Sequence, residues 1–285
     1  SNSLIDGYGN QSRSVGLIKN RVRDLIRQGK PTIGTRVLSS WPGITEVLAQ
    51  TGAYDYVEFL AEYAPWSLYD LENIARVADL YGMSSMIKID AQPRSFIAAK
   101  ALASGIQNFL FADIRTVKDA EEAIRSVRSE PKGFMGIGNF RVGGYVFTKV
   151  PISDYKKACD EAVVGFMIEK KSSVENLEEI LSVEGVDMVQ FGPWDYGLSI
   201  GLTGEPRSDW GLGSSKVKEA ELKVIKTALK MGKRPRVETM SMDTIEQYIS
   251  LGVRDFNIGT DTSILHSWWK EKGESLRKLL SKLEE

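Results

Sequence analysis

The chain has 285 residues, of which 42% are hydrophobic and 26% are charged, so it can bury a substantial core and is expected to be globular. Its 37 lysines and arginines are balanced by 38 aspartates and glutamates, which gives no electrostatic reason to expect nucleic acid or an anionic membrane as a partner. No apolar run reaches the roughly 18 to 20 residues of a transmembrane span. We therefore expect a small-molecule partner, with no nucleic acid and no membrane.

Two residue types that often carry chemistry are nearly absent, because Cys159 is the single cysteine and His266 the single histidine. One cysteine excludes an internal disulfide and is typical of a reducing compartment, so we expect a cytoplasmic protein. The same scarcity argues against a multi-histidine zinc site, a histidine-based catalytic triad and a Cys-His nucleophile pair. Any metal would have to be a hard cation with oxygen ligands.

The first residues, 1–14, have neither the basic nor the apolar pattern of a signal peptide and are expected to form a flexible leader. The stretch VGLIKNRVRDLIRQGK, residues 15–30, then predicts an N-terminal helix that ends near Gly29. Its apolar face would carry Val15, Leu17, Ile18, Val22, Leu25 and Ile26.

From Thr32 onward, short apolar runs alternate with amphipathic helical stretches. The eight predicted strands cover residues 32–39, 54–61, 84–90, 108–114, 163–169, 187–193, 235–239 and 255–261. The predicted helices cover residues 44–52, 68–82, 94–105, 117–129, 173–183, 217–232 and 242–252. Eight such repeats, with strands buried on both faces, favour a closed parallel (β/α)₈ TIM barrel over an open doubly wound sheet, which is the second possibility.

No linker rich in proline or serine divides residues 15–285, so we expect a single barrel domain. The glycine-rich stretch 131–151 is too long for a simple connection and predicts a functional loop. From about residue 264, the sequence predicts a charged C-terminal helix that begins with Trp268 and Trp269. These tryptophans would dock on the barrel itself or on a neighbouring subunit, and docking on the barrel is the first expectation.

The carboxyl ends of the predicted strands are rich in charged side chains. They carry Arg36, Glu58, Glu62, Tyr63, Lys88, Asp90, Asp113, Glu169, Asp195, Glu238 and Asp261. In a TIM barrel the loops after these ends form the active site. Carboxylates that lie close together repel one another, and a bound divalent cation relieves that repulsion.

Glu169 and Asp195 follow sequential strands, which are neighbours in a barrel, so their side chains could share one ion. Mg²⁺ takes one or two protein carboxylates and fills its remaining positions with water and substrate oxygens. A 2-oxo acid offers it a carboxylate and a keto oxygen, and the ion would stabilise the enolate formed when a bond at the next carbon breaks. This chemistry indicates a lyase. The alternative is that each acid is an ordinary helix cap or salt-bridge partner.

Four segments, EYAPW, MIKID, GTDTSIL and above all residues 168–201, resemble the HpcH/HpaI family of metal-dependent pyruvate aldolases. The last segment joins a strand that ends in glutamate to a helix, VEGVD and GPWDYGLSIG. The resemblance implies a TIM barrel of the phosphoenolpyruvate/pyruvate-binding type, with Mg²⁺ or Mn²⁺ held by Glu169 and Asp195. It also implies a homo-oligomer, a hexamer or a dimer, whose C-terminal helices swap between subunits.

The chain departs from this family at several site positions. Tyr63 stands where the family has its acid/base histidine, and a phenol of pKa about 10 is a poor base but a fair proton donor. Lys88 replaces an arginine on the enolate and lacks the bidentate fork. The loop reads GFMG at 133–136, without the family's arginine, which leaves Arg141 as a substitute. Arg36 adds a cation where the family usually has an apolar or aromatic residue.

We therefore expect a class II aldolase, a divalent-metal-dependent carbon–carbon lyase that acts on a 2-oxo acid and an aldehyde through a metal-bound pyruvate enolate. The residues expected to be catalytic are Lys88, Tyr63 and Arg36. Those expected to contact the substrate are Glu62, Gly192, Pro193 and Arg141, together with backbone N–H groups near Gly192 and in residues 133–144.

Structural roles stay open for three of these residues. Tyr63 could pack under Trp66, Lys88 could neutralise Asp90 or Glu58, and Arg36 could pair with Glu62. The alternative functions are a condensing or decarboxylating enzyme of the same superfamily, citrate-synthase-like or an oxaloacetate decarboxylase, and a degenerate barrel that binds a metabolite without turnover.

Overall fold

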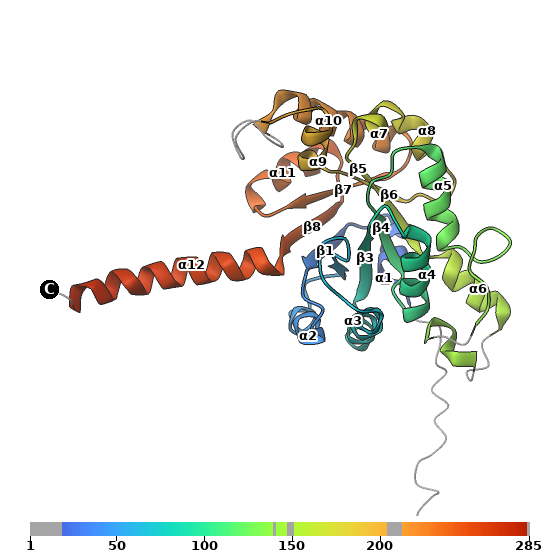
Figure 1. The fold of residues 1–285 in the computed structure, drawn as a ribbon, viewed down its shortest axis with the longest axis horizontal. Helices are drawn as coiled ribbons and strands as arrows, with labels where there is room; N and C mark the ends of the chain where they lie inside the picture. The colour runs from blue at the N-terminus through green and yellow to red at the C-terminus, as the bar shows by residue number, and fades with distance from the viewer. Residues whose placement is uncertain (1–18, 139–140, 147–150, 204–212, 284–285) are drawn as a thin grey trace, which may run out of the picture.

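The structure is a computed structural model that describes residues 19–138, 141–146, 151–203 and 213–283. Parallel strands form a closed barrel in the order β1 to β8, and helices surround it (Figure 1). The strands are β1 (Thr32–Val37), β2 (Tyr56–Phe59), β3 (Ser84–Ile89), β4 (Asn108–Phe111), β5 (Val163–Ile168), β6 (Met188–Phe191), β7 (Arg234–Thr239) and β8 (Asp255–Thr260). The predicted (β/α)₈ barrel is confirmed. The open sheet is excluded, because β1 pairs with β8.

The helices follow the predicted alternation with small differences. They are α1 (Arg21–Arg27), α2 (Pro42–Gln50), α3 (Leu68–Leu80), α4 (Arg94–Ser104), α5 (Val117–Ser126), α6 (Ile152–Asp160), α7 (Lys171–Glu175), α8 (Leu177–Leu181), α9 (Pro193–Ser199), α10 (Ser215–Lys230), α11 (Ile245–Leu251) and α12 (Asp261–Leu280). Single turns of 3₁₀ helix lie at Met242–Thr244 (η3) and Ser281–Leu283 (η4), and a kinked one at Arg141–Val146 (η1). The helix predicted over 173–183 is divided at Asn176, and α6 was not predicted because it buries only Tyr155 and Cys159.

The amino-terminal end of the barrel is covered by α1. The predicted leader, 1–14, and the first apolar positions of the predicted helix, Val15 to Ile18, lie outside the described residues. The helix begins after Asn20, whose side chain accepts a hydrogen bond from the N–H of Arg23. Val22 is fully buried against side chains of the barrel interior, and Ile26 packs beside it. This packing closes one end of the barrel, so a ligand site has to lie at the other.

The barrel interior contains an apolar cluster and a set of buried polar residues. Strands β2 to β6 contribute a buried apolar cluster that includes Tyr56, Met86, Leu110, Val163, Met167 and Met188. Strands β7 and β8 contribute the buried polar residues Arg236, Asp255 and Asn257. The guanidinium of Arg236 forms an ion pair with Glu58 of β2, across the interior. A charged layer therefore lies directly beneath the open end.

The seam between β6 and β7 is the weakest in the backbone ladder. It contains two residue pairs, Met188 with Arg234 and Val189 with Pro235, whereas β5 and β6 share four pairs. Pro235 has no N–H to donate, which limits the ladder here. Towards the carboxyl ends, Gln190 joins the two strands through its side chain, because it accepts from Nε of Arg236 at 2.7 Å and donates to Glu238 at 3.0 Å.

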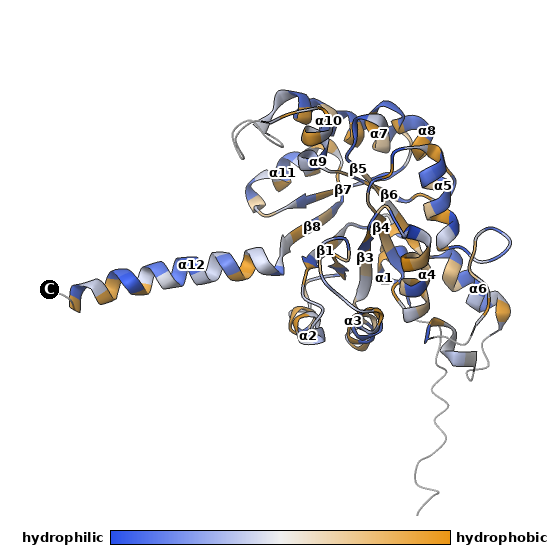
Figure 2. Cartoon of the chain, viewed as in Figure 1, coloured by the Kyte–Doolittle hydropathy of each residue, from blue (hydrophilic) through white to orange (hydrophobic). Residues whose placement is uncertain are grey.

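Helix α12 extends away from the barrel as a single rod (Figure 1). Its first residue, Asp261, accepts hydrogen bonds from the backbone N–H groups of Leu38 and Ser39 at 3.0 and 2.9 Å, which fixes the helix to the end of β1. None of the residues 261–280 is buried, and apolar bands alternate with hydrophilic ones along the rod (Figure 2). Trp268 and Trp269 are 59% and 61% exposed, so the expectation that they dock on their own barrel was wrong.

The C-terminal helix is present as predicted, although it begins at Asp261 rather than at about residue 264. Within the described part of the chain, no helix is both long and apolar enough to cross a membrane.

Candidate active site

A cavity of about 530 Å³ opens at the carboxyl ends of the strands. Most of the predicted site residues line it: Arg36, Tyr63, Lys88, Glu169, Gly192, Pro193 and Asp195. They come from the ends of β1, β2, β3, β5 and β6. The barrel thus brings together predicted site residues that are up to 159 positions apart in the sequence, from Arg36 to Asp195.

Lys88 lies at the centre of the polar contacts in this cavity. Its Nζ atom lies 2.8 Å from Oε2 of Glu62, and it donates a hydrogen bond to the hydroxyl of Tyr63 at 3.1 Å. Burial acts to lower the pKa of Lys88, but Glu62, Tyr63 and Glu169 raise it by more, so the net pKa lies above its usual value. The partner of Lys88 is therefore Glu62, not Asp90 or Glu58, and the side chain remains a cation.

The turn after β2 explains how Tyr63 reaches Lys88. The indole of Trp66 donates to the carbonyl oxygen of Ala61 at 2.9 Å and packs edge-on against Phe59. This closes the turn and directs the side chains of Glu62 and Tyr63 towards β3. Burial raises the pKa of Tyr63 to about 12, although the ammonium of Lys88 acts in the opposite direction. The phenol is consequently a proton donor at neutral pH, and not a base.

Glu169, at the end of β5, is buried and held in one orientation. Its Oε1 atom accepts a hydrogen bond of 2.8 Å from the backbone N–H of Asp113. Asp113 has a φ of 55°, a left-handed conformation that is uncommon for residues other than glycine, and this conformation belongs to the turn that presents its N–H to the carboxylate. Burial raises the pKa of Glu169, while Lys88 and the N–H of Asp113 lower it, and the net pKa is raised.

Gly192 leaves the second oxygen of Glu169 accessible. A Cβ atom at position 192 would lie 2.7 Å from Cβ of Glu169 and 2.8 Å from its Oε2 atom. Any larger residue would therefore displace the carboxylate. The N–H of Gly192 donates to the carbonyl oxygen of Ile168 at 3.0 Å, so this N–H is not the substrate donor that the sequence suggested.

Asp195 lies in the first turn of α9, beside Lys170. The Nζ atom of Lys170 donates to Oδ1 of Asp195 at 3.1 Å and lies 3.8 Å from Oδ1 of Asp113. Sequence reasoning missed Lys170, although a lysine directly after the glutamate of a strand end was the available signal. Lys170 thus neutralises one of the two predicted metal ligands.

The residues present fit a hard divalent cation with few protein ligands. Within the described residues, no group of three or more metal-ligating side chains gathers in one place. The accessible oxygen of Glu169 and the half-exposed Asp195 form a pair of carboxylates, and Mg²⁺ or Mn²⁺ can complete such a set with water and substrate oxygens.

Arg36 and Glu238 form an ion pair at the edge of the cavity, so the partner of Arg36 is not Glu62. Glu58 is fully buried beneath the mouth and pairs with Arg236, which sequence reasoning also missed. The signal for Arg236 was present in the stretch RPRVET, where a charged residue alternates with apolar ones and therefore faces the barrel interior.

Arg141 is not brought to this cavity. Its guanidinium pairs with Asp79 at 2.6 Å and donates to the carbonyl oxygen of Ser104 at 3.1 Å. Asp79 and Ser104 stand near the C-terminal ends of α3 and α4, which lead into the amino-terminal ends of β3 and β4. The described part of residues 131–151 likewise contacts the C-terminal end of α5, since the N–H of Phe134 donates to the carbonyl oxygen of Arg125. This segment therefore lies at the end opposite to the candidate site.

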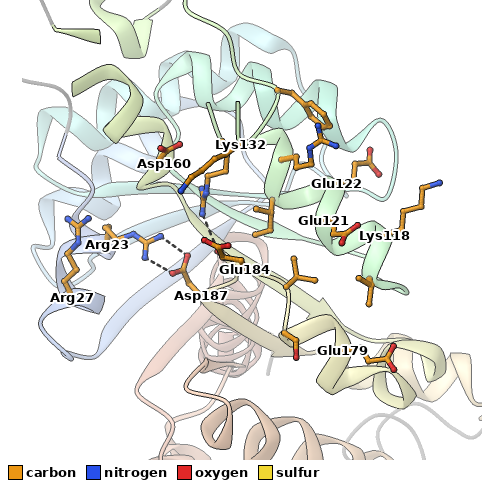
Figure 3. A pocket seen from close by; sticks show the side chains of 18 residues that line it. Arg23, Arg27, Lys118, Glu121, Glu122, Lys132, Asp160, Glu179, Glu184 and Asp187 are labelled. Carbon is orange, nitrogen blue, oxygen red and sulfur yellow. Dashed lines mark hydrogen bonds and ion pairs between the residues drawn. The ribbon is translucent and has the colours of Figure 1, made fainter. Parts of the chain in front are cut away.

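A larger cavity, of about 1270 Å³, lies at that opposite end, between α1, α5 and α8 (Figure 3). Its acidic and basic side chains are mixed, and several are paired with one another or with the backbone. Arg23 forms a two-pronged ion pair with Asp187, at 2.6 and 2.8 Å, and Arg128 donates to the carbonyl oxygen of Ala162 at 3.0 Å. These contacts brace the closed end of the barrel, so the smaller cavity at the mouth is the better candidate site.

Comparison with known proteins shows the family to which the chain belongs. The family model described as "HpcH/HpaI aldolase/citrate lyase" matches residues 38–266. The 4-hydroxy-2-oxo-heptane-1,7-dioate aldolase of Escherichia coli is 27% identical over 249 residues, which is 87% of this chain and 91% of that protein. The hydroxypyruvate/pyruvate aldolase of Paraburkholderia phytofirmans is 29% identical and is covered to 89%, with 86% of this chain matched.

Two examples show the solved structures to which the fold is similar. The HpcH/HpaI aldolase from Desulfitobacterium hafniense superposes with a TM-score of 0.81 at 22% identity, over 91% of this chain and 97% of that one. The citrate synthase SbnG superposes with a TM-score of 0.78 at 19% identity, over 94% of this chain and all of that one.

Proposed function

Because the chain belongs to the HpcH/HpaI aldolase/citrate lyase family, we propose that it is a divalent-metal-dependent carbon–carbon lyase that acts on a 2-oxo acid. The observation that carries this proposal is the shared cavity of Lys88, Tyr63, Glu169 and Asp195 at the carboxyl ends of the strands. It combines a buried cation, a proton donor and two carboxylates. This set suits a reaction in which negative charge develops on an enolate oxygen and is later quenched by a proton.

Glu169 and Asp195 are the residues that would hold the cation, Mg²⁺ or Mn²⁺. When bound, such a cation supplies Lewis-acid stabilisation of negative charge on the keto oxygen of the substrate. The protein's own contribution is to hold Glu169 by the N–H of Asp113 and to keep the space beside it free through Gly192. Pro193 lines the same wall of the cavity.

Lys88 is the protein cation that faces the developing negative charge. It is buried and fixed by Glu62 and Tyr63, so it needs little rearrangement during the reaction. Tyr63 donates a proton to the carbon or oxygen that becomes basic, directly or through water, and Lys88 stabilises the phenolate that remains. Arg36, paired with Glu238, contributes a further positive group at the cavity edge.

A test of the ligand assignment compares Glu169→Gln and Asp195→Asn with the unchanged protein in the cleavage of 4-hydroxy-2-oxo acids. Both variants are expected to lose metal-dependent activity. Full metal-dependent activity in either one would contradict the assignment of that residue.

The decarboxylation of oxaloacetate is the second candidate, and the raised pKa of Tyr63 favours it. Cleavage of a 4-hydroxy-2-oxo acid requires a base to remove the hydroxyl proton, whereas loss of CO₂ requires only a stabilised enolate and a proton donor. Tyr63 meets the second requirement better than the first. Initial rates with oxaloacetate and with a 4-hydroxy-2-oxo acid, on the same preparation, separate the two activities.

We also propose that the protein is cytoplasmic, in keeping with its one free cysteine, Cys159. We further propose that it is a homo-oligomer whose subunit contacts include α12. Support comes from the exposed apolar residues of this helix: Ile264, Leu265, Trp268, Trp269, Leu276, Leu279 and Leu280. Replacement of Trp268 and Trp269 by glutamate should lower the mass in sedimentation equilibrium, whereas glutamate at the exposed Leu80 of α3 should leave it unchanged. A monomeric unchanged protein would contradict this proposal.

A further inference from the structure

The ammonium of Lys170 contacts the carboxylate of Asp195, one of the two proposed metal ligands. Its Nζ atom donates to Oδ1 of Asp195 at 3.1 Å, and its side chain is only 17% exposed. The backbone of Lys170 is also fixed. Its N–H donates to Oγ of Ser173 at 3.1 Å, and its carbonyl oxygen accepts from the same hydroxyl at 2.8 Å. The backbone of Lys170 is therefore fixed directly after Glu169, and its ammonium contacts Asp195, the other proposed metal ligand.

We propose that Lys170 is a tethered competitor of the divalent cation, which lowers the affinity of this site for metal and keeps Asp195 neutralised while no metal is bound. The inference rests on the proposed function, because it takes Glu169 and Asp195 as the metal ligands. It assigns to Lys170 a role in setting metal affinity. It assigns it no contact with the substrate.

The competition follows from charge. A divalent cation that uses Asp195 would stand within a few ångströms of the ammonium, and a like charge at that range opposes binding by about tenfold or more in affinity, even in a solvated site. Lys170 would have to release Asp195 when the metal binds. An alternative acceptor is already near, because Oδ1 of Asp113 lies 3.8 Å from the same Nζ atom.

Asp113 is suited to receive this charge. It carries a carboxylate that is already shared with Arg115 at 2.9 Å, and its backbone N–H holds Glu169. The movement of Lys170 from Asp195 to Asp113 would therefore leave the hydrogen bond to Glu169 intact. At Asp195, the divalent metal ion would replace the ammonium of Lys170 with little rearrangement of the backbone.

The experiment is titration of the metal-free protein with Mn²⁺ alone. Binding is monitored by calorimetry and by the electron paramagnetic resonance signal of free Mn²⁺. Three variants are compared with the unchanged protein. Lys170→Gln removes the charge, Lys170→Arg keeps it, and Lys171→Gln removes the neighbouring charge, whose side chain is 64% exposed and pairs with Glu175 instead. Circular dichroism of each variant checks that the fold is retained.

Lys170→Gln is expected to bind Mn²⁺ about tenfold more tightly than the unchanged protein. Lys170→Arg and Lys171→Gln are expected to bind it with nearly the original affinity. If the unchanged protein binds Mn²⁺ and Lys170→Gln binds it equally or more weakly, the competition is refuted and the proposed function stands. If none of the four proteins binds Mn²⁺, both the competition and the metal-dependent function are refuted.

Discussion

The ammonium of Lys88 donates a hydrogen bond of 3.1 Å to the hydroxyl of Tyr63, and it also lies 4.8 Å from the centre of the Tyr63 ring. This contact links two of the residues, Tyr63 and Lys88, at which the sequence was expected to depart from the family pattern. A cation beside a phenol stabilises the phenolate that forms once the proton has been given away. The two substitutions are therefore parts of one proton-donating unit.

Tyr63→Phe should lower the rate of turnover by about 100-fold, because it removes the proton donor and leaves the ring in place. The folded-state pKa of about 12 lies above the ordinary value of 10.0, so the phenol stays protonated from pH 6 to pH 9 and is half-ionised only near pH 12. The rate ratio of the two proteins should thus be constant from pH 6 to about pH 9. A ratio that falls steeply within this range would show that Tyr63 titrates there and is not the donor described.

Lys88→Met should lower turnover by about 100- to 1000-fold, as for the loss of one group that stabilises an oxyanion. Lys88→Arg should recover part of this loss, because it restores the charge without the same geometry. The exposed Lys100, on α4, provides a matched control, and Lys100→Met should leave turnover unchanged. Initial rates at saturating metal give the comparison, and equal rates for Lys88→Met and the control would exclude an electrostatic role for Lys88.

Gly192→Ala should weaken Mn²⁺ binding by about tenfold, because the added Cβ displaces the carboxylate of Glu169. Gly136→Ala is the control, since a Cβ at position 136 has no neighbour within 4 Å. Both proteins should keep the circular dichroism of the unchanged chain. Equal Mn²⁺ affinity for the two variants would mean that Oε2 of Glu169 is not a ligand.

Glu58→Gln should lower the free energy of unfolding by about 3 kcal/mol, because it leaves the guanidinium of Arg236 buried without its ion-pair partner. Glu72→Gln breaks the exposed pair with Arg76 on α3 and should cost about 1 kcal/mol or less. Urea unfolding measures both variants. A double variant in which Glu58 and Arg236 are both replaced by apolar residues should lose less than the two single variants together.

The barrel could be predicted because most strands are short apolar runs buried on both faces, and these runs alternate with amphipathic helices. The pairing of β1 with β8, which closes the sheet, was expected because the sequence contains eight strand and helix repeats, the number in a TIM barrel. Helix α6 was missed because it buries few side chains, and the division of α7 from α8 depends on the local conformation of Asn176. Neither feature has a strong periodic signal.

The site could be predicted to the level of residue types at strand ends, but the pairing of charges could not. Lys88 was a candidate partner of Asp90 or Glu58, and the turn closed by Trp66 places Glu62 there instead. Arg141 was predicted to substitute for the arginine that the resemblance places in the loop over 133–144, but that loop follows α5 and therefore lies at the closed end of the barrel. Which side chains meet across the barrel depends on strand register and height, which composition and spacing do not contain.

The central claim is that the protein forms a metal-stabilised enolate. Its most direct test is the exchange of deuterium into the methyl group of pyruvate, monitored by proton NMR in D₂O. It requires only that a methyl proton of pyruvate leaves to water in the cavity and that the resulting enolate is stabilised, so the identity of the aldehyde does not matter. We predict exchange in the presence of Mg²⁺ or Mn²⁺ that is abolished by a chelator and by Glu169→Gln. Exchange that is unaffected by the chelator and by this substitution, or that is absent while oxaloacetate also remains intact, would contradict a metal-dependent enolate mechanism.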